Sequence, residues 1–178
     1  MRICVDAGHG GTDPGAIGRT TFTLKEKDFN LQLALKLEPE LIRRGHEVLM
    51  VRRSDRTFSL GARARFANMH GAQLFISIHA NAAANVSAEG MEVFHFTGSA
   101  QGQRFARRIL DQMLQTFPDH KNRGIKEANF AVLRLTNMPA VLVECEFLTH
   151  PRQLEFLADD SNQQALAEAI ARGVSEPN

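Results

Sequence analysis

The sequence predicts an α/β fold, in the form of a single three-layer domain with a mostly parallel or mixed central sheet and helices on both faces. Short apolar runs alternate with amphipathic stretches along all 178 residues, which is the pattern of alternating strands and helices. No internal repeat, low-complexity tract or linker interrupts them, so residues 1–178 are expected to form one domain. Apolar residues make up 43% of the chain, a composition that excludes a disordered or disulfide-stapled protein.

Five apolar runs predict the strands of the sheet. The run LFISIH is almost continuously apolar, as expected for a central strand that is buried on both faces. The other runs are bounded by glycine, proline or charged residues, which are typical of strand ends. In chain order the predicted strands are Arg2–Asp6, His46–Arg52, Leu74–His79, Met91–Phe96 and Ala140–Glu144.

Amphipathic stretches between the runs predict the helices. In Lys25–Arg44, leucine or phenylalanine recurs with helical spacing, and Gly45 provides the stop. Pro39 lies inside this pattern, and because proline lacks an N–H we expect it to kink the helix or split off its last turn. The other predicted helices are Ser59–His70, Ser99–Gln115, Gln153–Ala158 and Gln163–Arg172.

The charge balance and the hydropathy of the chain argue against several classes of function. The chain has 21 Lys+Arg and 20 Asp+Glu, a balance that argues against binding nucleic acid or a membrane surface by gross electrostatics. No apolar run approaches the ~20 residues that cross a bilayer, so no membrane insertion is expected. The segment Met1–Asp6 is too short and too charged to start a signal peptide. Cys4 and Cys145 fall in predicted strands, which favours free buried thiols over a disulfide.

Potentially reactive side chains follow three of the predicted strands. His9 lies in the glycine-rich loop after the first strand, and His79 and Glu144 each close a later strand. Because functional residues collect beyond the carboxyl ends of strands in such sheets, these side chains are expected to share one rim. Two histidines and a carboxylate form the ligand set of a catalytic zinc. Glu26, at the start of the first long helix, is the favoured carboxylate ligand, and Asp28 is its rival.

Several other motifs point less clearly to chemistry. The segment HEVL begins like a helical zinc-protease motif, but Met50 stands where the second histidine would be, and the segment reads as a strand. The loop at Gly8–Gly15 is rich in glycine but lacks the GxGxxG spacing of a nucleotide-binding loop. A lone histidine is usually structural, and five are read in that way: His46, His70, His95, His120 and His150.

Seven separated motifs occur in one order along almost the whole chain. They are VDAGHGGTDPGA at Val5–Ala16, KEKDFNLQLA at Lys25–Ala34, SLGARARFAN at Ser59–Asn68, FISIHAN at Phe75–Asn81, GMEVF at Gly90–Phe94, NRGIK at Asn122–Lys126 and FAVLRLTNMPAVLVE at Phe130–Glu144. In these motifs the chain resembles the zinc-dependent N-acetylmuramoyl-L-alanine amidases called amidase type 3. Each motif is weak, but seven in register are specific.

The resemblance implies a function and a site. His9, Glu26 and His79 match the three zinc ligands of the family, which implies one Zn²⁺ per chain, and Glu144 matches its catalytic glutamate. The family cleaves the amide between N-acetylmuramic acid and L-alanine in peptidoglycan. A metal ion can lower the pKa of water and polarise the scissile carbonyl, and a carboxylate such as Glu144 can move the proton.

The sequence departs from the family pattern after Glu144. Glu146 replaces a usual glycine and would share a face with Glu144 in a regular strand, because side chains repeat every two residues. It could then compete for the catalytic role or raise the pKa of Glu144. Arg123 and Lys126 are candidates for holding the anionic stem peptide, with a solvated basic turn as the alternative. Asn81 could contact substrate, orient a ligand, or be a turn residue.

Some relatives carry an inserted helix that covers the zinc until a partner removes it. Only 43 residues separate His79 from Arg123 (123 − 79 − 1), so we expect an open site, as in endolysin-like or sporulation-type members. The resemblance implies action in the periplasm or cell wall by a monomer, and the absence of a signal peptide is expected for a trimmed chain or phage-type release. Two alternatives remain: an inactive domain that binds wall fragments, and another zinc amidohydrolase on the same scaffold.

Overall fold

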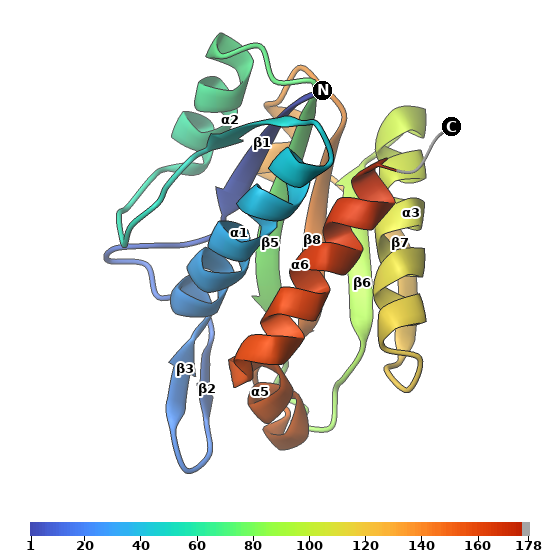
Figure 1. The fold of residues 1–178 in the computed structure, drawn as a ribbon. Coiled ribbons are helices and arrows are strands. Elements are labelled where there is room, and N and C mark those ends of the chain that lie inside the picture. Colours follow the sequence, from blue (N-terminus) through green and yellow to red (C-terminus); the bar gives the residue numbers. More distant parts are fainter. Residues whose placement is uncertain (176–178) are drawn as a thin grey trace.

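A six-stranded mixed sheet forms the centre of the computed structural model, which describes residues 1–175 (Figure 1). The strand order is β4-β1-β5-β8-β6-β7. The first four strands in this order are parallel, β6 runs antiparallel to β8, and β7 is parallel to β6. The strands are β1 (Arg2–Ala7), β4 (Glu47–Met50), β5 (Leu74–Asn81), β6 (Met91–Phe96), β7 (Asn122–Ala128) and β8 (Ala140–Phe147).

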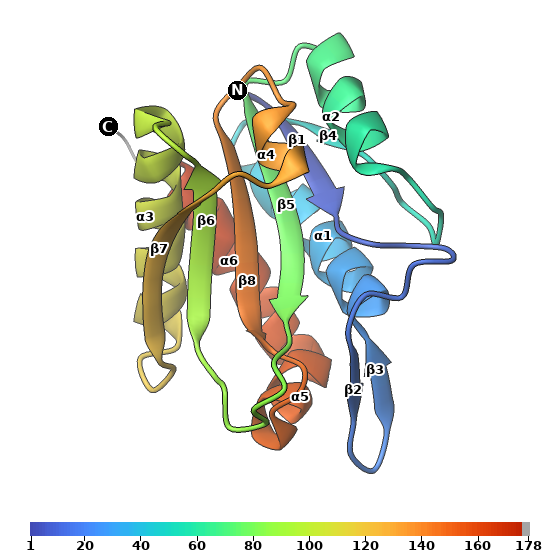
Figure 2. The same cartoon turned by 180° about the vertical axis from the view of Figure 1, so that it is seen from behind.

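Helices cover both faces of this sheet, which confirms the expected three-layer architecture. One face carries α1, α3, α5 and α6, with α6 packed against both α1 and α3, and the other face carries α2 and α4 (Figures 1 and 2). The helices are α1 (Glu26–Arg43), α2 (Leu60–Met69), α3 (Ala100–Thr116), α4 (Ala131–Arg134), α5 (Pro151–Ala158) and α6 (Asp160–Ser175).

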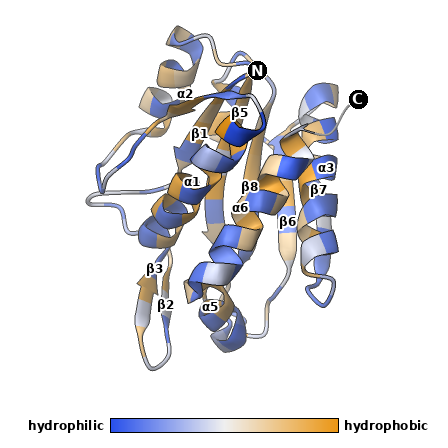
Figure 3. Ribbon diagram, in the orientation of Figure 1, coloured by the Kyte–Doolittle hydropathy of each residue, from blue (hydrophilic) through white to orange (hydrophobic). Residues whose placement is uncertain are grey.

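Strand β5 shows how the sequence divides the interior into two cores. Its side chains alternate between the faces, so Ile76 and Ile78 join the larger core under α1, α3 and α6, whereas Phe75 joins the smaller core under α2 and α4. All three are fully buried, and each such side chain stabilises the fold by about 1.5–3 kcal/mol. The central strands are accordingly the most hydrophobic part of the molecule (Figure 3).

Helix α1 continues through Pro39 to Arg43 as one element, so the expectation that its last turn would split off is wrong. Pro39 and Leu35, whose carbonyl loses its helical donor, both lie on the exposed side of the helix, where water can hydrate that carbonyl. On the opposite side Leu37 and Leu41 are fully buried. Packing on the buried side therefore outweighs the one missing hydrogen bond.

Four short elements were not predicted from the sequence. A hairpin of β2 (Ile17–Arg19) and β3 (Thr23–Lys25) extends beyond the sheet just before α1 (Figure 1). Strand β7 was read as a basic loop because it is polar and only partly buried, as is common for an edge strand. Helix α4 is a single turn, which is too short for any period to appear in the sequence.

Two expectations from composition can be compared with the structure. Cys4 and Cys145 are both buried free thiols, as predicted, and they belong to different cores. Within residues 1–175, none of the helices combines the length and hydrophobicity needed to span a membrane.

Candidate metal centre and its cleft

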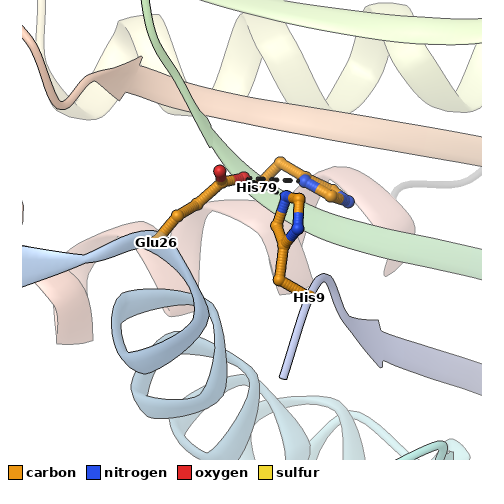
Figure 4. Close-up of side chains that lie close together, drawn as sticks. All are labelled: His9, Glu26 and His79. Atoms are coloured by element: carbon orange, nitrogen blue, oxygen red, sulfur yellow. Dashed lines mark hydrogen bonds and ion pairs between the residues drawn. The ribbon is translucent and has the colours of Figure 1, made fainter. Parts of the chain in front are cut away.

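Three segments that are distant in sequence bring His9, Glu26 and His79 to one rim of the sheet. His9 lies in the loop after β1, Glu26 is the first residue of α1, and His79 is near the carboxyl end of β5. Their side chains point toward one another (Figure 4). One ligand atom from each residue lies within 4.8 Å of those of the other two. Asp28 is not part of this cluster.

The donor atoms converge on one oxygen of Glu26. Its Oε1 lies 2.8 Å from Nδ1 of His79 and 3.1 Å from Nε2 of His9. Two ligands of a tetrahedral zinc, each ~2.1 Å from the ion, are about 3.4 Å apart, so this cluster fits such an ion after small adjustments. The other oxygen, Oε2, accepts a hydrogen bond of 2.9 Å from the backbone N–H of Ala16, which fixes the carboxylate.

The glycine-rich loop is needed for this close approach. A Cβ atom on Gly8 would lie 2.2 Å from the His79 ring, and one on Gly15 would lie 2.5 Å from Oε2 of Glu26. Gly15 also has φ of +64°, in the left-handed region that favours glycine. A side chain at either position would therefore push a candidate ligand away.

Asp13, which the sequence reading did not single out, orients the first histidine. Its Oδ2 is 2.8 Å from Nδ1 of His9, so Nδ1–H can donate to the carboxylate and leave Nε2 for an ion. A carboxylate behind a histidine ligand is a common support of metal sites. Its position four residues after His9, in the same loop, was the available sequence signal.

The cluster has the electrostatics of an anion held between two imidazoles. Burial by itself raises the pKa of Glu26, but hydrogen bonds from His79 and His9 outweigh burial and hold that pKa far below its ordinary value. Burial lowers the pKa of His9, and its interactions with Glu26 and Asp13 outweigh this and raise it. These interactions favour the ionised form of Glu26, which is the form that binds a metal ion.

Glu144 stands beside the cluster in a different environment. It is the register partner of His79 across β5 and β8, and both residues line the same cleft. Its Oε2 is inaccessible to solvent and has no hydrogen-bond partner. Burial, followed by the negative charges of Glu26 and Glu92, raises the pKa of Glu144 well above its ordinary value. Such a carboxyl group is suited to exchanging a proton.

Glu146 does not share the face of Glu144, so the expectation from the two-residue period is wrong. The pairing of β5 with β8 shifts by one residue after Glu144, because Asn81 is opposite Phe147. This bulge turns Glu146 away from the cleft. Its fully buried carboxylate binds the ring of His120 at 2.9 Å and accepts the N–H of Gly90 at 2.7 Å. The raised pKa of Glu144 comes from burial, Glu26 and Glu92, and not from Glu146.

Glu92, which the sequence reading did not identify, brings together the three residues expected to contact substrate. Its Oε1 accepts Nδ2 of Asn81 at 2.7 Å, and its Oε2 pairs with Nε of Arg123 at 3.0 Å and with Nζ of Lys126. Glu92 is also the register partner of Glu144. The two basic residues therefore lie on a strand rather than in a solvated turn, one buried carboxylate away from Glu144.

The cleft has a volume of about 450 Å³ and one apolar wall. Phe58 and Leu60, at the start of α2, and Phe130 and Val132, at α4, line it together with His9, His79 and Glu144. Phe130 is 41% exposed, so part of its ring is free to contact a ligand in the cleft. No pattern in the sequence predicts this wall, because α4 is a single turn and its place depends on the tertiary fold.

Taken together, the fold and the site define an α/β protein with a candidate metal centre of hydrolase type at the carboxyl ends of parallel strands. A family model described as N-acetylmuramoyl-L-alanine amidase matches residues 3–176. The chain belongs to this family, and its function is that of a cell-wall N-acetylmuramoyl-L-alanine amidase.

Known relatives are similar along nearly the whole chain. N-acetylmuramoyl-L-alanine amidase CwlM of Bacillus licheniformis is 37% identical over 98% of this chain and 68% of its own length. A probable cell wall amidase of Staphylococcus aureus, LytH, is 34% identical, and the match covers 97% of this chain and 56% of LytH. The crystal structure of an N-acetylmuramoyl-L-alanine amidase from Clostridium difficile 630 is similar with a TM-score of 0.92 at 38% identity, covering 97% of this chain and 94% of that one.

Proposed function

We propose that this protein is a zinc-dependent hydrolase of the amide between N-acetylmuramic acid and L-alanine in peptidoglycan. His9, Glu26 and His79 would hold one zinc ion per chain, and Glu144 would transfer the proton. The observation that carries the proposal is the convergence of three ligand atoms within 4.8 Å beside a buried carboxyl group in the same cleft.

A zinc ion in this place would polarise the scissile carbonyl and make a water molecule more acidic. The residues of the chain supply the remaining parts of the reaction. Glu144 accepts the proton of the attacking water and returns it to the nitrogen of the leaving L-alanine, so that the C–N bond breaks to give a carboxylate and an amine. Its raised pKa suits this exchange. A carboxyl of ordinary pKa carries almost no proton near neutral pH, so it could rarely donate one to the leaving nitrogen.

The substrate would lie along the cleft in a defined direction. Arg123 and Lys126 are half-buried cations on β7, two strands beyond Glu144 in the sheet, and we propose that they attract the carboxylates of the stem peptide. Asn81 would act by holding Glu92 in place, through its 2.7 Å hydrogen bond. The apolar wall at Phe130 would contact the less polar part of the substrate, near the scissile amide.

The site is proposed to be open, without a covering helix. Support comes from the segment between β5 and β6: residues 82–90 contain no helix. Helix α3, the next element after β6, packs against α6 on the opposite face of the sheet. The protein would then act on the cell wall as an active monomer. Activity that appears only when a protein activator is added would contradict this part of the proposal.

The test is hydrolysis of purified peptidoglycan by the purified chain, measured as new amino groups with their residue identified by end-group labelling. Wild type should release the amino group of L-alanine, and removal of zinc by a chelator should abolish the release. Glu144→Gln should bind one zinc and lose about 10²–10⁴-fold in rate. Glu127→Gln, on the exposed part of β7, is the matched control and should behave as wild type.

Other outcomes would replace the proposal with a named alternative. New amino groups from residues further along the stem would indicate a peptidase of the same scaffold. A wild type that binds zinc and peptidoglycan but releases nothing would indicate a binding domain.

A further inference from the structure

The backbone that carries His9 is held by two arginines from a different part of the chain. Arg52 donates from Nε to the carbonyl of Ala7 at 2.8 Å and from Nη2 to that of Gly8 at 3.0 Å. Arg63 donates from Nη1 to Ala7 at 2.8 Å and from Nη2 to His9 at 2.6 Å. Three successive carbonyl groups at the end of β1 are thus fixed by side chains 44 to 56 residues away.

Arg52 also joins two of the segments that carry candidate ligands. The same Nη2 that binds the carbonyl of Gly8, just before His9, donates at 2.8 Å to the carbonyl of Lys27, just after Glu26. One guanidinium group therefore sets the spacing between the β1 loop and the start of α1. A planar fork with several donors can do this, whereas the single ammonium of lysine cannot reach all three carbonyls.

Burying the charges of Arg52 and Arg63 costs desolvation free energy, so their contacts must compensate that cost. Both residues are 3% exposed, and both donate to the carbonyl of Ala7. Burial and the neighbouring Arg63 lower the pKa of Arg52. Arg63 has a buried ion pair with Asp6 at 2.7 Å. A buried charge persists only where such interactions compensate its desolvation, and here half of the hydrogen bonds of the two arginines go to the carbonyls of Ala7, Gly8 and His9.

A second set of contacts ties the outer part of the same loop to residues 55–57. Asp55 accepts the N–H of Gly11 at 2.6 Å, and Thr57 donates to the carbonyl of Gly10 at 3.3 Å. A Cβ on Gly10 would lie 2.3 Å from the carbonyl oxygen of Arg56. The two segments therefore touch along their length, and the loop cannot move independently.

We propose that Arg52 and Arg63 are positioning residues of the metal centre. They keep His9 in its left-handed conformation, with φ of +59°, so that its ring meets Glu26 and His79. That conformation is uncommon for a residue with a side chain and persists only when its surroundings impose it. The inference rests on the proposed function in one respect, namely that the cluster binds a divalent metal ion.

The test measures metal binding directly. Zinc affinity is obtained by competition with a fluorescent chelator, and the coordination geometry from the visible absorption of the Co²⁺-loaded protein. Arg52→Lys and Arg63→Lys keep the charge and lose the fork, and we expect each to weaken zinc binding by about 10–100-fold and to change the Co²⁺ spectrum. Arg65→Lys, on the exposed face of α2, is the matched control and should leave both unchanged.

A variant that fails to fold would not decide the matter, so circular dichroism of each metal-free variant is recorded first. If the lysine variants unfold, Asp55→Ala replaces them, because Asp55 is exposed and binds the same loop; a weakening of several-fold is then expected. Affinities within twofold of wild type, with an unchanged Co²⁺ spectrum, would overturn the inference. A wild type that binds no zinc would overturn the proposed function instead.

Discussion

Around Glu26 both carboxylate oxygens have hydrogen-bond donors, from two histidine rings and the N–H of Ala16. Around Glu144, which lines the cleft together with His9 and His79, one oxygen has none. The pKa of Glu26 is held below its ordinary value because the hydrogen bonds outweigh the effect of burial. The pKa of Glu144 is raised because burial and the negative charges of Glu26 and Glu92 all act in the same direction. The two carboxyl groups belong to the same residue type and both neighbour His79, and they differ in what surrounds them.

Under the proposed function, this difference suits the two groups to separate tasks. A carboxylate that never takes up a proton is a good metal ligand, and a carboxyl that takes one up readily is a good acid–base group. Pairs of titratable groups whose pKa values are pushed apart are typical of hydrolytic sites. Substitutions at these two groups and at their neighbours test whether metal binding and proton transfer are separated in this way.

Glu26→Gln and Glu144→Gln should separate metal binding from proton transfer. Glu26→Gln removes the charge at the centre of the cluster and should lower zinc affinity by about 100-fold or more, since even supporting residues contribute 10–100-fold. Glu144→Gln should retain one zinc. Metal analysis after dialysis against a weak chelator measures both. Loss of zinc from Glu144→Gln but not from Glu26→Gln would reverse the assignment.

Glu144→Gln should also stabilise the zinc-stripped protein at neutral pH, by about 1–3 kcal/mol, because glutamine cannot ionise and so avoids the cost of keeping this buried group protonated while the unfolded chain releases its proton. The sign follows from the raised pKa of Glu144. As pH rises above the unfolded-state pKa, the unfolded chain loses this proton while the folded chain keeps it, so stability falls until the folded group also ionises.

Denaturant unfolding of the two proteins at a series of pH values measures this difference. It should be small at pH 4, where the carboxyl is protonated in both states, and should grow toward pH 8. If the difference in unfolding free energy between wild type and Glu144→Gln stayed constant over this range, the pKa of Glu144 would not be raised in the folded protein.

Glu92→Gln should move the pH profile of activity in a defined direction. Glu92 contributes to the raised pKa of Glu144, and its loss would also leave the charges of Arg123 and Lys126 uncompensated nearby. Both changes lower the pKa of Glu144, so the acidic limb of kcat/KM should shift to lower pH. A shift to higher pH would show that Glu92 acts on Glu144 chiefly by other means.

The smallest effect is expected at the edge of the site. Lys126 is 39% exposed and shares Glu92 with Arg123, and partly exposed charges contribute about 0.2–1 kcal/mol. Lys126→Met should therefore raise KM for peptidoglycan fragments by about 1.5- to 5-fold and leave kcat unchanged. Fragments whose stem carboxylates are amidated should show no difference between the two proteins.

The sequence by itself determined the larger elements and the candidate ligands. The strands β1, β5, β6 and β8 and the long helices follow from periods of two and 3.6 residues, which neighbouring residues impose on each other. His9 and His79 were found because their place at strand ends can be read without knowing what lies opposite. The choice of Glu26 over Asp28 followed from position and motif, and the cluster contains Glu26.

The tertiary structure alone decided which side chains face the cleft and how they titrate. A one-residue bulge in β8 separates Glu146 from Glu144, and no local pattern announces it. The carbonyls of Ala7, Gly8 and His9 that accept from Arg52 and Arg63 lie 44 to 56 residues away, and Glu92 contacts residues on two other strands. Burial and charge depend on all the atoms that surround a group, so pKa values and hydrogen-bond partners are properties of the assembled fold rather than of its segments.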